Sequence, residues 1–412
     1  MNILFLTVSR INDLSDKGIY TDLMRKFAKE GHSVFIVTPL ERRYKQSTEL
    51  VRNGVTSLLR IRTLNFQKAG LFEKFLSALL INIQFKRGIG KHFGSVRFDL
   101  VLYSTPPITF TRLVGQLKSK YSSVSYLLLK DIFPQNAVDL GYMRKNSLLH
   151  RYFLKREKKL YRISDFIGCM SAGNVEYLLR MNPEINPGKV EINPNCHELY
   201  EISATSSEKK LIRKNLNIPE DAVLFVFGGN MGISQGIGFF IKFLESQING
   251  TGVFFLIIGS GTESKKIHAW FNARQPSNAI FLPEMAKQDF NKILKACDAG
   301  MIFLDRRFTI PNFPSRILSY LENKLAIIAA TDSSTDLGQV IVRNGFGLWS
   351  EAGDLDSLAK NVSFIAGNPH LCKIMGEKGY NYMKDNFSVD ISYNAIVNHF
   401  PGCYAFQESF EN

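Results

Sequence analysis

The sequence predicts an α/β protein built from two doubly wound domains, each with a mainly parallel sheet covered by helices on both faces. The first observation is length, because 412 residues exceed what one ordinary core holds. The second is that apolar runs alternate with amphipathic segments, as in NILFLTV, YTDLMRKFAKEG and HSVFIVTP. The third is that this alternation restarts at Ala222 with AVLFVFGGN.

The expected domains follow from this restart. Residues 1–200 form the first domain, residues 201–380 the second, and a helical segment over 381–412 packs back on the first domain. Strands of the first domain are expected in NILFLTV, HSVFIVTP, FDLVLYSTPP, SVSYLLLKDIFP, SDFIGCMSAG and KVEINPN, and those of the second in AVLFVFGGN, VFFLIIGSG, NAIFLPEM, AGMIFLD, AIIAATD and FGLWSEAG. The polar stretch 202–214 is the expected linker. Ligands of open parallel sheets bind at the carboxyl ends of strands, so we expect the active site in a cleft between the domains.

Composition excludes several classes of protein. The hydrophobic fraction of 45% and the aromatic fraction of 12% are typical of globular proteins. Five cysteines lack the paired spacing of a disulfide framework or a zinc site. The N-terminal MNILFLTVSR enters a strand without a charged leader, and no segment reaches the roughly 18 apolar residues of a membrane span. A reducing, cytoplasmic setting is therefore expected.

The positive charge is concentrated in the first half of the chain. Residues 1–200 hold 31 lysines and arginines against 16 acidic residues, whereas residues 201–412 hold 20 against 21. Lysines that keep a protein in solution explain such an excess as readily as a ligand does. No recognition motif accompanies the charge, so we expect no nucleic-acid partner. The asymmetry favours a negatively charged partner on the first domain.

A glycine-rich connection, FGGNMGISQGIGFF over 227–240, joins a strand to a helix. It matches neither the GxGxxG fingerprint nor a P-loop. A phosphate cradle and a tight turn both require glycine, so the loop alone leaves both interpretations open. Its position after a strand favours a ligand site that includes Gly229, Asn230 and Gln235.

A second candidate is the segment TIPNFPSRILSYL. Pro314 and Ser315 suit the start of a helix, where backbone N–H groups favour an anion. Arg316 in the first turn has the wrong charge for the helix dipole, which suggests an anionic partner. A surface arginine without a role is the alternative.

Several segments together resemble retaining family 4 glycosyltransferases, which have the two-domain GT-B fold. They are KGIYTDLMRKFAKEGHSVFIVTP, the glycine-rich loop, FLIIGSG, FLPEM and PSRILSYLENKLAIIAATD. DIFPQNAVDLG, GGNMGISQG, FPSRILSYL and TDLG further resemble a bacterial subgroup that assembles surface polysaccharides and includes proteins described as N-acetyl-L-fucosamine (L-fucosamine) transferases. The resemblance implies two Rossmann-like domains facing across a cleft, a UDP-sugar donor, a lipid-diphosphate-linked saccharide acceptor and no metal cofactor. It implies donor binding by Gly18, Gly229, Asn230, Gln235, Pro283, Glu284, Ser315, Arg316 and Ser319.

The chain departs from the family pattern in its donor residues. Most relatives carry an arginine and a lysine in the second-domain loop, where this chain has Asn230 and Gln235. The two family glutamates fall at Pro311 and Ser319, neither of which is acidic. We therefore expect Arg316 to meet the donor diphosphate, because its planar fork can bind two phosphate oxygens.

Catalysis in this family is ascribed to front-face attack, in which the leaving phosphate helps to take the acceptor proton. A protein base is then dispensable. If one exists, we expect Asp131, which ends an apolar strand of the first domain. A helix cap or a buried salt bridge at Asp131 remains open. Asp354 is interpreted as a helix cap and His197 as structural.

The segment 70–93, GLFEKFLSALLINIQFKRGIGKHF, has an apolar face flanked by basic residues. Such a segment suits an anionic membrane interface, although a core helix with basic flanks is equally consistent. With the basic first half of the chain, it predicts peripheral attachment to the inner face of the cytoplasmic membrane. The residues expected to face the membrane are Phe72, Phe75, Leu79, Lys86 and Arg87, on a face that also includes Leu76, Leu80, Ile83 and Phe85.

The predicted function is transfer of a sugar, such as an N-acetylated amino sugar, in O-antigen or capsule synthesis. Two alternatives remain. One is a nucleotide-sugar epimerase of the same fold, and the other is a noncatalytic protein that binds membranes or polyanions.

Overall fold

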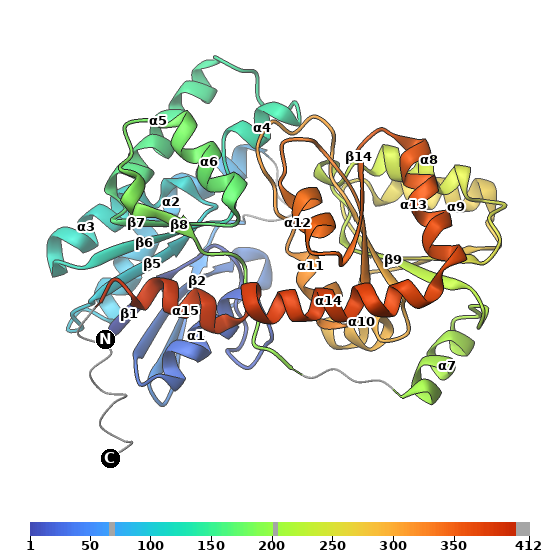
Figure 1. Ribbon diagram of the computed structural model, residues 1–412. Helices are drawn as coiled ribbons and strands as arrows, with labels where there is room; N and C mark the ends of the chain where they lie inside the picture. The colour runs from blue at the N-terminus through green and yellow to red at the C-terminus, as the bar shows by residue number, and fades with distance from the viewer. Residues whose placement is uncertain (66–70, 201–204, 401–412) are drawn as a thin grey trace. The chain divides into compact units, whose positions relative to one another are not determined.

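The computed structural model describes residues 1–65, 71–200 and 205–400. The chain divides into two compact units, one comprising Met1–Glu198 together with the chain from Ser388, the other Leu199–Phe387. Each unit has one central sheet with helices packed on both of its faces (Figure 1). The predicted α/β class with two doubly wound, Rossmann-like domains is confirmed.

The first unit contains an eight-stranded sheet in the order β3-β4-β2-β1-β5-β6-β7-β8, in which only the β3–β4 pair is antiparallel. Its strands are β1 (Asn2–Leu6), β2 (Ser33–Glu41), β3 (Glu49–Asn53), β4 (Thr56–Thr63), β5 (Leu100–Ser104), β6 (Val124–Leu129), β7 (Phe166–Cys169) and β8 (Val190–Ile192). Its helices are α1 (Ile19–Lys29), α2 (Leu71–His92), α3 (Thr111–Tyr121), α4 (Gln135–Asp139), α5 (Leu148–Ile163), α6 (Ala172–Met181) and α15 (Val389–Val397), with the short 3-10 helices η1 (Arg42–Tyr44), η2 (Ile108–Phe110) and η3 (Pro187–Lys189).

Both faces of this sheet are covered. The central strands read as unbroken apolar runs because parallel strands are buried on both sides, and every residue of β5 is buried. Right-handed crossovers place α2, α3, α5 and α6 on one face and α1 on the other. The C-terminal α15 lies beside α1 (Figure 1), where its Val389, Ile396 and Val397 join the buried core.

The second unit contains a six-stranded parallel sheet in the order β11-β10-β9-β12-β13-β14. Its strands are β9 (Val223–Asn230), β10 (Val253–Ser260), β11 (Ala279–Leu282), β12 (Ala299–Phe303), β13 (Ala326–Thr331) and β14 (Gly347–Glu351). Its helices are α7 (Ser206–Asn215), α8 (Ile237–Ser246), α9 (Ser264–Arg274), α10 (Lys287–Leu294), α11 (Arg316–Glu322), α12 (Leu337–Arg343), α13 (Leu355–Gly367) and α14 (Pro369–Phe387), with the 3-10 helix η4 (Ile233–Gln235).

The strand order of the second unit reverses at β9, which lies between β10 and β12. This reversal is the point where open α/β sheets bind ligands, just beyond the carboxyl ends of the strands. Beneath it, Phe227, Phe240, Phe243 and Phe303 pack ring against ring between the sheet and α8. The end of β9, where the glycine-rich loop begins, is therefore packed against a cluster of four aromatic rings.

The linker prediction is wrong from residue 206 onward, where α7 forms instead. Thr205 caps this helix by accepting from the Glu208 N–H, and the Glu208 carboxylate accepts from the Thr205 N–H. This reciprocal capping box stabilises the start of a helix in a polar sequence that periodicity alone marks as a loop. Residues 201–204 lie outside the described part.

Candidate functional site

A cavity of about 430 Å³ opens at the carboxyl ends of β9, β10 and β11. Three apolar side chains, from Ile258, Met285 and Phe290, form part of its lining. Its polar lining comes from Asn230, Ser260, Glu284 and Lys287, together with the backbone of Gly229 and Gly259. Apolar walls with a few converging polar groups are typical of small-molecule sites.

Two glycines allow a strand and a helix to approach β9 closely around this cavity. Gly228 is buried, its N–H donates to the Tyr320 hydroxyl at 2.9 Å, and a Cβ there would lie 2.4 Å from the Phe290 ring. Gly259 has a φ of +150°, and a Cβ there would lie 2.0 Å from the carbonyl oxygen of Gly229. Packing by itself therefore requires glycine at these two positions.

Arg316 approaches the glycine-rich loop from the start of α11. Its Nη2 donates to the backbone oxygen of Asn230 at 3.1 Å, and its Cζ lies 4.8 Å from the centroid of the Phe227 ring. Burial lowers the pKa of Arg316, although a guanidinium remains charged at neutral pH. These contacts hold the Arg316 cation beside the glycine-rich loop, and Asn230 of that loop lines the cavity.

The Nη1 atom of Arg316 is buried and, among the described residues, has no hydrogen-bond partner. The Oε1 atom of Gln235, an acceptor in the same loop, is also buried and has no hydrogen-bond partner among the described residues. The Nε2 atom of Gln235 donates to the Ser234 hydroxyl at 3.3 Å. A buried donor without a partner costs about 1–3 kcal/mol, so such groups are typically satisfied by a ligand or by water.

The remaining donor residues of unit 2 lie at different depths. Glu284 lines the cavity, where its Oε2 accepts from the Ser260 hydroxyl at 2.5 Å, and Pro283 before it is exposed. Ser315 is the exposed residue that precedes α11. Ser319 is half-buried within α11, and its backbone oxygen accepts from the Asn323 amide at 2.8 Å.

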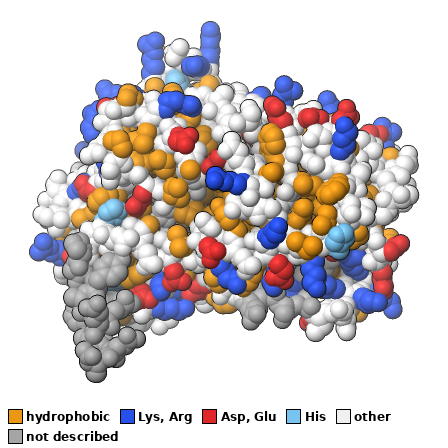
Figure 2. Space-filling view, in the orientation of Figure 1, with side chains coloured by type: hydrophobic (Ala, Val, Ile, Leu, Met, Phe, Trp, Pro, Cys, Tyr) orange, Lys and Arg blue, Asp and Glu red, His pale blue; other side chains and the backbone are white. Residues whose placement is uncertain are grey.

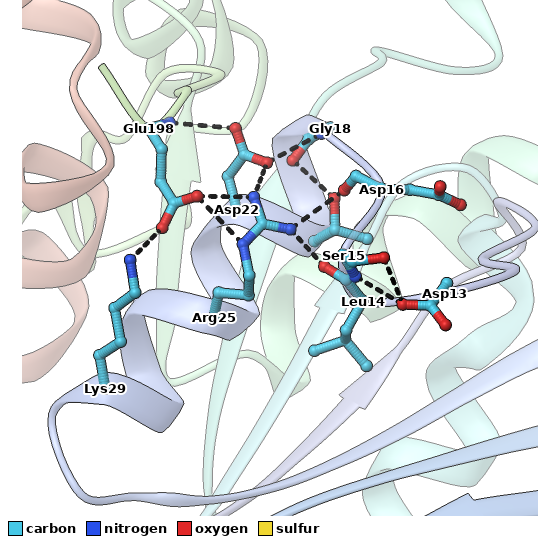
Figure 3. A network of polar contacts seen from close by, with 10 residues as sticks. Asp13, Leu14, Ser15, Asp16, Gly18, Asp22, Arg25, Lys29 and Glu198 are labelled. Atoms are coloured by element: carbon cyan, nitrogen blue, oxygen red, sulfur yellow. Dashed lines mark hydrogen bonds and ion pairs between the residues drawn. The ribbon is translucent and has the colours of Figure 1, made fainter. Parts of the chain in front are cut away.

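Gly18 lies in the first unit, at the start of α1, and its N–H is already engaged. It donates to Oδ1 of the buried Asp22 at 2.8 Å, and Oδ2 of Asp22 accepts from the Glu198 N–H at 3.0 Å (Figure 3). Arg25 joins both carboxylates at 2.6 and 2.7 Å. Its Nη1 also donates to the backbone oxygens of Leu14 and Asp16. This network fixes the loop before α1 to the last residues of Met1–Glu198.

Glu198 and Asp22 together raise the pKa of Arg25. Burial by itself would lower it, but hydrogen bonds and charges from Glu198 and Asp22 outweigh that effect. Lys29 adds a further ion pair to Glu198 at 2.7 Å from an exposed position (Figure 3). The network is therefore built around one half-buried guanidinium between two carboxylates.

Asp131 lies just beyond β6, on a backbone held by Thr105. The Thr105 hydroxyl accepts from the N–H groups of Lys130 and Asp131 at 3.0 and 3.2 Å. The Asn136 amide donates to Oδ1 of Asp131 at 3.3 Å, and burial raises the pKa of Asp131 to about 6. Neither alternative for Asp131 is found, because Pro134 precedes α4 and no cation of the described residues lies within salt-bridge distance.

Lys130, beside Asp131, is a polar group that the sequence reasoning missed. Its Nζ donates to the backbone oxygen of Asn193 at 3.1 Å, and burial lowers its pKa to about 8. Two neighbouring residues with pKa values displaced toward neutrality are typical of functional sites, although structural networks also produce them.

Helix α2 has two faces of different character. Ser77, Ile81, Phe85 and Ile89 are buried at a spacing of four residues, and the Phe85 ring lies 5.7 Å from that of Phe110. The expectation that Phe85 belongs to the membrane-facing side is wrong, because this i, i+4 stripe packs on the sheet. The opposite face exposes Leu76, Leu79, Ile83, Lys86 and Arg87.

The side chains of Phe72 and Phe75 lie outside the described residues. Within the described part, none of the helices combines the length and the apolar character that crossing a bilayer requires. Likewise, the described residues contain no group of three or more His, Cys, Asp or Glu side chains able to hold a metal ion.

Asp354 caps α13 by accepting from the Ser357 N–H at 3.0 Å, which confirms the capping prediction.

A second cavity, also of about 430 Å³, lies on the other side of the glycine-rich loop. The first turn of α8 lines it together with Arg306, Arg307 and Lys266. Arg307 pairs with Asp305 at 2.8 Å and Lys266 pairs with Glu263, while Arg306 is exposed. Neither Arg306 nor Ser260 was expected from the sequence. Ser260 could have been predicted as a site residue, because it ends the strand that pairs with β9.

Residues 208–382 match the family model described as "Glycosyl transferases group 1", over the unit that holds both cavities. Over 313 residues the chain is 24% identical to the probable glycosyltransferase WbjE of Pseudomonas aeruginosa, covering 74% of this chain and 72% of that protein. The chain is a glycosyltransferase.

Solved structures show that this glycosyltransferase has the GT-B fold. Anabaena Alr3699/HepE, solved in complex with UDP, superposes with a TM-score of 0.70 at 12% identity over 98% of this chain and 100% of that chain. WaaG, a glycosyltransferase involved in lipopolysaccharide biosynthesis, superposes with a TM-score of 0.65 at 13% identity over 96% of this chain and 99% of that chain. The resemblance is thus confirmed for the GT-B fold, and residues 208–382 are similar to group 1. Membership of family 4 and of the N-acetyl-L-fucosamine subgroup stays a prediction.

Proposed function

We propose that the glycosyltransferase moves a sugar, with retention, from a UDP-sugar to a lipid-diphosphate-linked saccharide. The observation that carries the proposal is the buried Nη1 of Arg316 beside the glycine-rich loop, which has no hydrogen-bond partner among the described residues. Negative charge grows on the diphosphate as it leaves the sugar. A guanidinium already fixed in place stabilises that charge without reorganising during the reaction.

The cavity beside this loop suits the nucleoside of the donor. Its apolar walls, including Phe290, match the faces of a planar base, and the Glu284 carboxylate can accept hydrogen bonds from hydroxyl groups. Its volume of about 430 Å³ lies within the usual range of small-molecule pockets. The UDP complex of the structurally similar HepE supports UDP as the carrier.

Asp131 is our candidate to take the acceptor proton, with the leaving phosphate as its partner in that role. With a pKa of about 6, its carboxyl group is mainly ionised above neutral pH and can accept a proton. The proposed pathway is O-antigen or capsule synthesis, which the lipopolysaccharide role of WaaG supports, and the proposed donor carries an N-acetylated amino sugar such as N-acetyl-L-fucosamine. The mechanism needs no metal ion.

The proposed location is the inner face of the cytoplasmic membrane. The exposed side of α2 presents Leu79 and Ile83, with Lys86 and Arg87 next to them. This arrangement suits partial insertion between anionic headgroups.

The test is release of UDP over time from candidate UDP-sugars in the presence of a lipid-linked acceptor. The expected result is UDP release that depends on the acceptor, with formation of a glycosylated lipid. Epimerisation without UDP release would support the epimerase instead. Retained vesicle binding without any chemistry would support a noncatalytic protein.

A further inference from the structure

Three large apolar side chains are exposed in the segment before α5 and in its first turn. Leu148 is 86% exposed, Tyr142 62% and Leu149 46%. Single exposed apolar residues are common on protein surfaces and need no explanation. Here the three lie within eight residues of the chain, which makes them a cluster. We call this surface, formed by residues 142–159, the α5 surface.

The α5 surface is also strongly basic. Residues 140–163 contain eight lysines and arginines and one acidic residue, Glu157. Glu157 is 6% exposed, accepts from the Tyr161 hydroxyl at 2.8 Å, and has its pKa raised to about 7 by burial. The segment therefore presents no carboxylate to solvent to balance its cations.

Most of these cations have no ion-pair partner within the part of the chain that the structure describes. Lys158 pairs with Glu184 at 3.4 Å. In the described ranges, no carboxylate lies within salt-bridge distance of Arg144, Lys145, Arg151 or Lys155. Figure 2 shows basic side chains projecting at its upper edge, over the region that Figure 1 labels α5, with hydrophobic side chains below them.

The apolar cluster belongs to an ordered element. The Ser147 hydroxyl caps α5 by accepting from the His150 N–H at 3.2 Å. The buried His150 accepts in turn from the Asn146 N–H at 3.2 Å. Further along the helix, the buried residues Glu157, Leu160 and Tyr161 form its inner face. The fold thus holds two adjacent leucines outward on a capped helix.

We propose that the α5 surface docks the first unit onto an anionic lipid bilayer. Cations attract the headgroups, while leucine and tyrosine side chains enter the boundary between headgroups and acyl chains. A soluble polyanion would use the cations but would leave the leucines exposed to water. A lipid surface engages both kinds of side chain, which decides between these two partners.

The α5 surface is distinct from the exposed side of α2. Both helices pack on η2, on the same face of the sheet, so the two surfaces belong to one side of the unit. The biological purpose of docking rests on the proposed lipid-linked acceptor, but the physical argument for it does not. Lipid binding and glycosyl transfer can therefore be tested separately.

The test is co-sedimentation with vesicles of phosphatidylcholine and phosphatidylglycerol at a ratio of 7:3, compared with pure phosphatidylcholine. We expect Leu148→Ser with Leu149→Ser to weaken binding to the anionic vesicles roughly tenfold. Arg144→Glu with Lys145→Glu should weaken it at least as strongly, and more at low salt. The matched control replaces Leu211 and Ile374, apolar residues 59% and 48% exposed on the other unit, by serine.

A direct readout of insertion comes from Leu148→Trp. The position is 86% exposed, so the larger ring fits without repacking, and the two native tryptophans lie in the other unit. We expect the added tryptophan emission to shift to shorter wavelength with anionic vesicles. Unfolding curves of every variant should match wild type.

Several outcomes would overturn the inference. One is wild-type vesicle binding by both double variants, and another is loss of binding only in Lys86→Glu with Arg87→Glu on α2. A third is loss of binding to heparin in the arginine–lysine variant while vesicle binding persists, which would identify a surface for soluble polyanions. Absence of UDP binding in the wild-type protein would refute the proposed function alone and would leave lipid docking intact.

Discussion

Replacing Arg316 by alanine removes the cation that lies between the glycine-rich loop and α11. A hydrogen bond to a charged group contributes about 1.5–3 kcal/mol. Because 1.4 kcal/mol corresponds to a factor of ten, UDP binding should weaken about 10- to 150-fold if Nη1 contacts the diphosphate. The Nη2 bond to Asn230 and the contact with Phe227 are lost as well. The substitution also removes a buried donor that has no partner among the described residues, so the free energy of unfolding should change by no more than about 1 kcal/mol.

The assay is isothermal titration calorimetry with UDP, accompanied by urea unfolding of each variant. Arg316→Lys keeps the charge but loses the planar fork, so it should bind with intermediate affinity. Arg343→Ala removes an exposed arginine of α12 and serves as the matched control. Unchanged UDP affinity in a folded Arg316→Ala protein would refute our reasoning. Loss of affinity in Arg306→Ala alone would move the diphosphate to the second cavity.

Three further predictions concern Asp131, a glycine and the polar network of the first unit. The fold raises the pKa of Asp131 to about 6, so its ionisation opposes folding as pH rises from about 4 to 6. In urea unfolding, Asp131→Asn should therefore stabilise the protein more at pH 8 than at pH 5. The same variant should have a lower kcat, and its pH–activity profile should lose the rise near pH 6 that ionisation of Asp131 produces in the wild type. Gly259→Ala places a Cβ 2.0 Å from a backbone oxygen of the neighbouring strand, and it should lower the melting temperature by several degrees or prevent folding; a normal melting temperature would contradict this. Arg25→Ala removes the ion partner of the buried Asp22, which keeps its two backbone N–H bonds, and should cost about 1.5–3 kcal/mol because Arg25 is only half-buried. Lys29→Ala, at an exposed position, should cost less than about 1 kcal/mol. Equal losses in the two variants would argue against this ranking.

Local features of the site could be read from the sequence because each depends on a short stretch of chain. The glycine-rich connection begins in the last four residues of β9 and leads into α8, and Asp354 caps α13 because its carboxylate needs only a backbone N–H three residues on. Asn230 and Glu284 were expected at a donor site, and both line the cavity at the carboxyl ends of the strands.

Other features depended on contacts between distant segments. The partners of Glu284 and Asn230 are Ser260 of β10 and Arg316 of α11, and their meeting depends on strand order, which single-sequence periodicity does not specify. The position of Phe85 was misjudged for a related reason. A helix with apolar residues on two sides does not indicate which side meets the sheet, and only the packing on β4 and η2 decided it.

The sequence by itself determined the two α/β units, because the alternation of strand and helix patterns is a local property that repeats along the chain. It also determined the charge asymmetry, which is a matter of counting. Only the tertiary structure decided that Arg316 meets the glycine-rich loop with one nitrogen that has no partner among the described residues. It alone also decided that Leu148 is exposed at the start of a basic helix. Burial and the absence of a partner are properties of the surrounding atoms, and those atoms come from segments far apart in the chain.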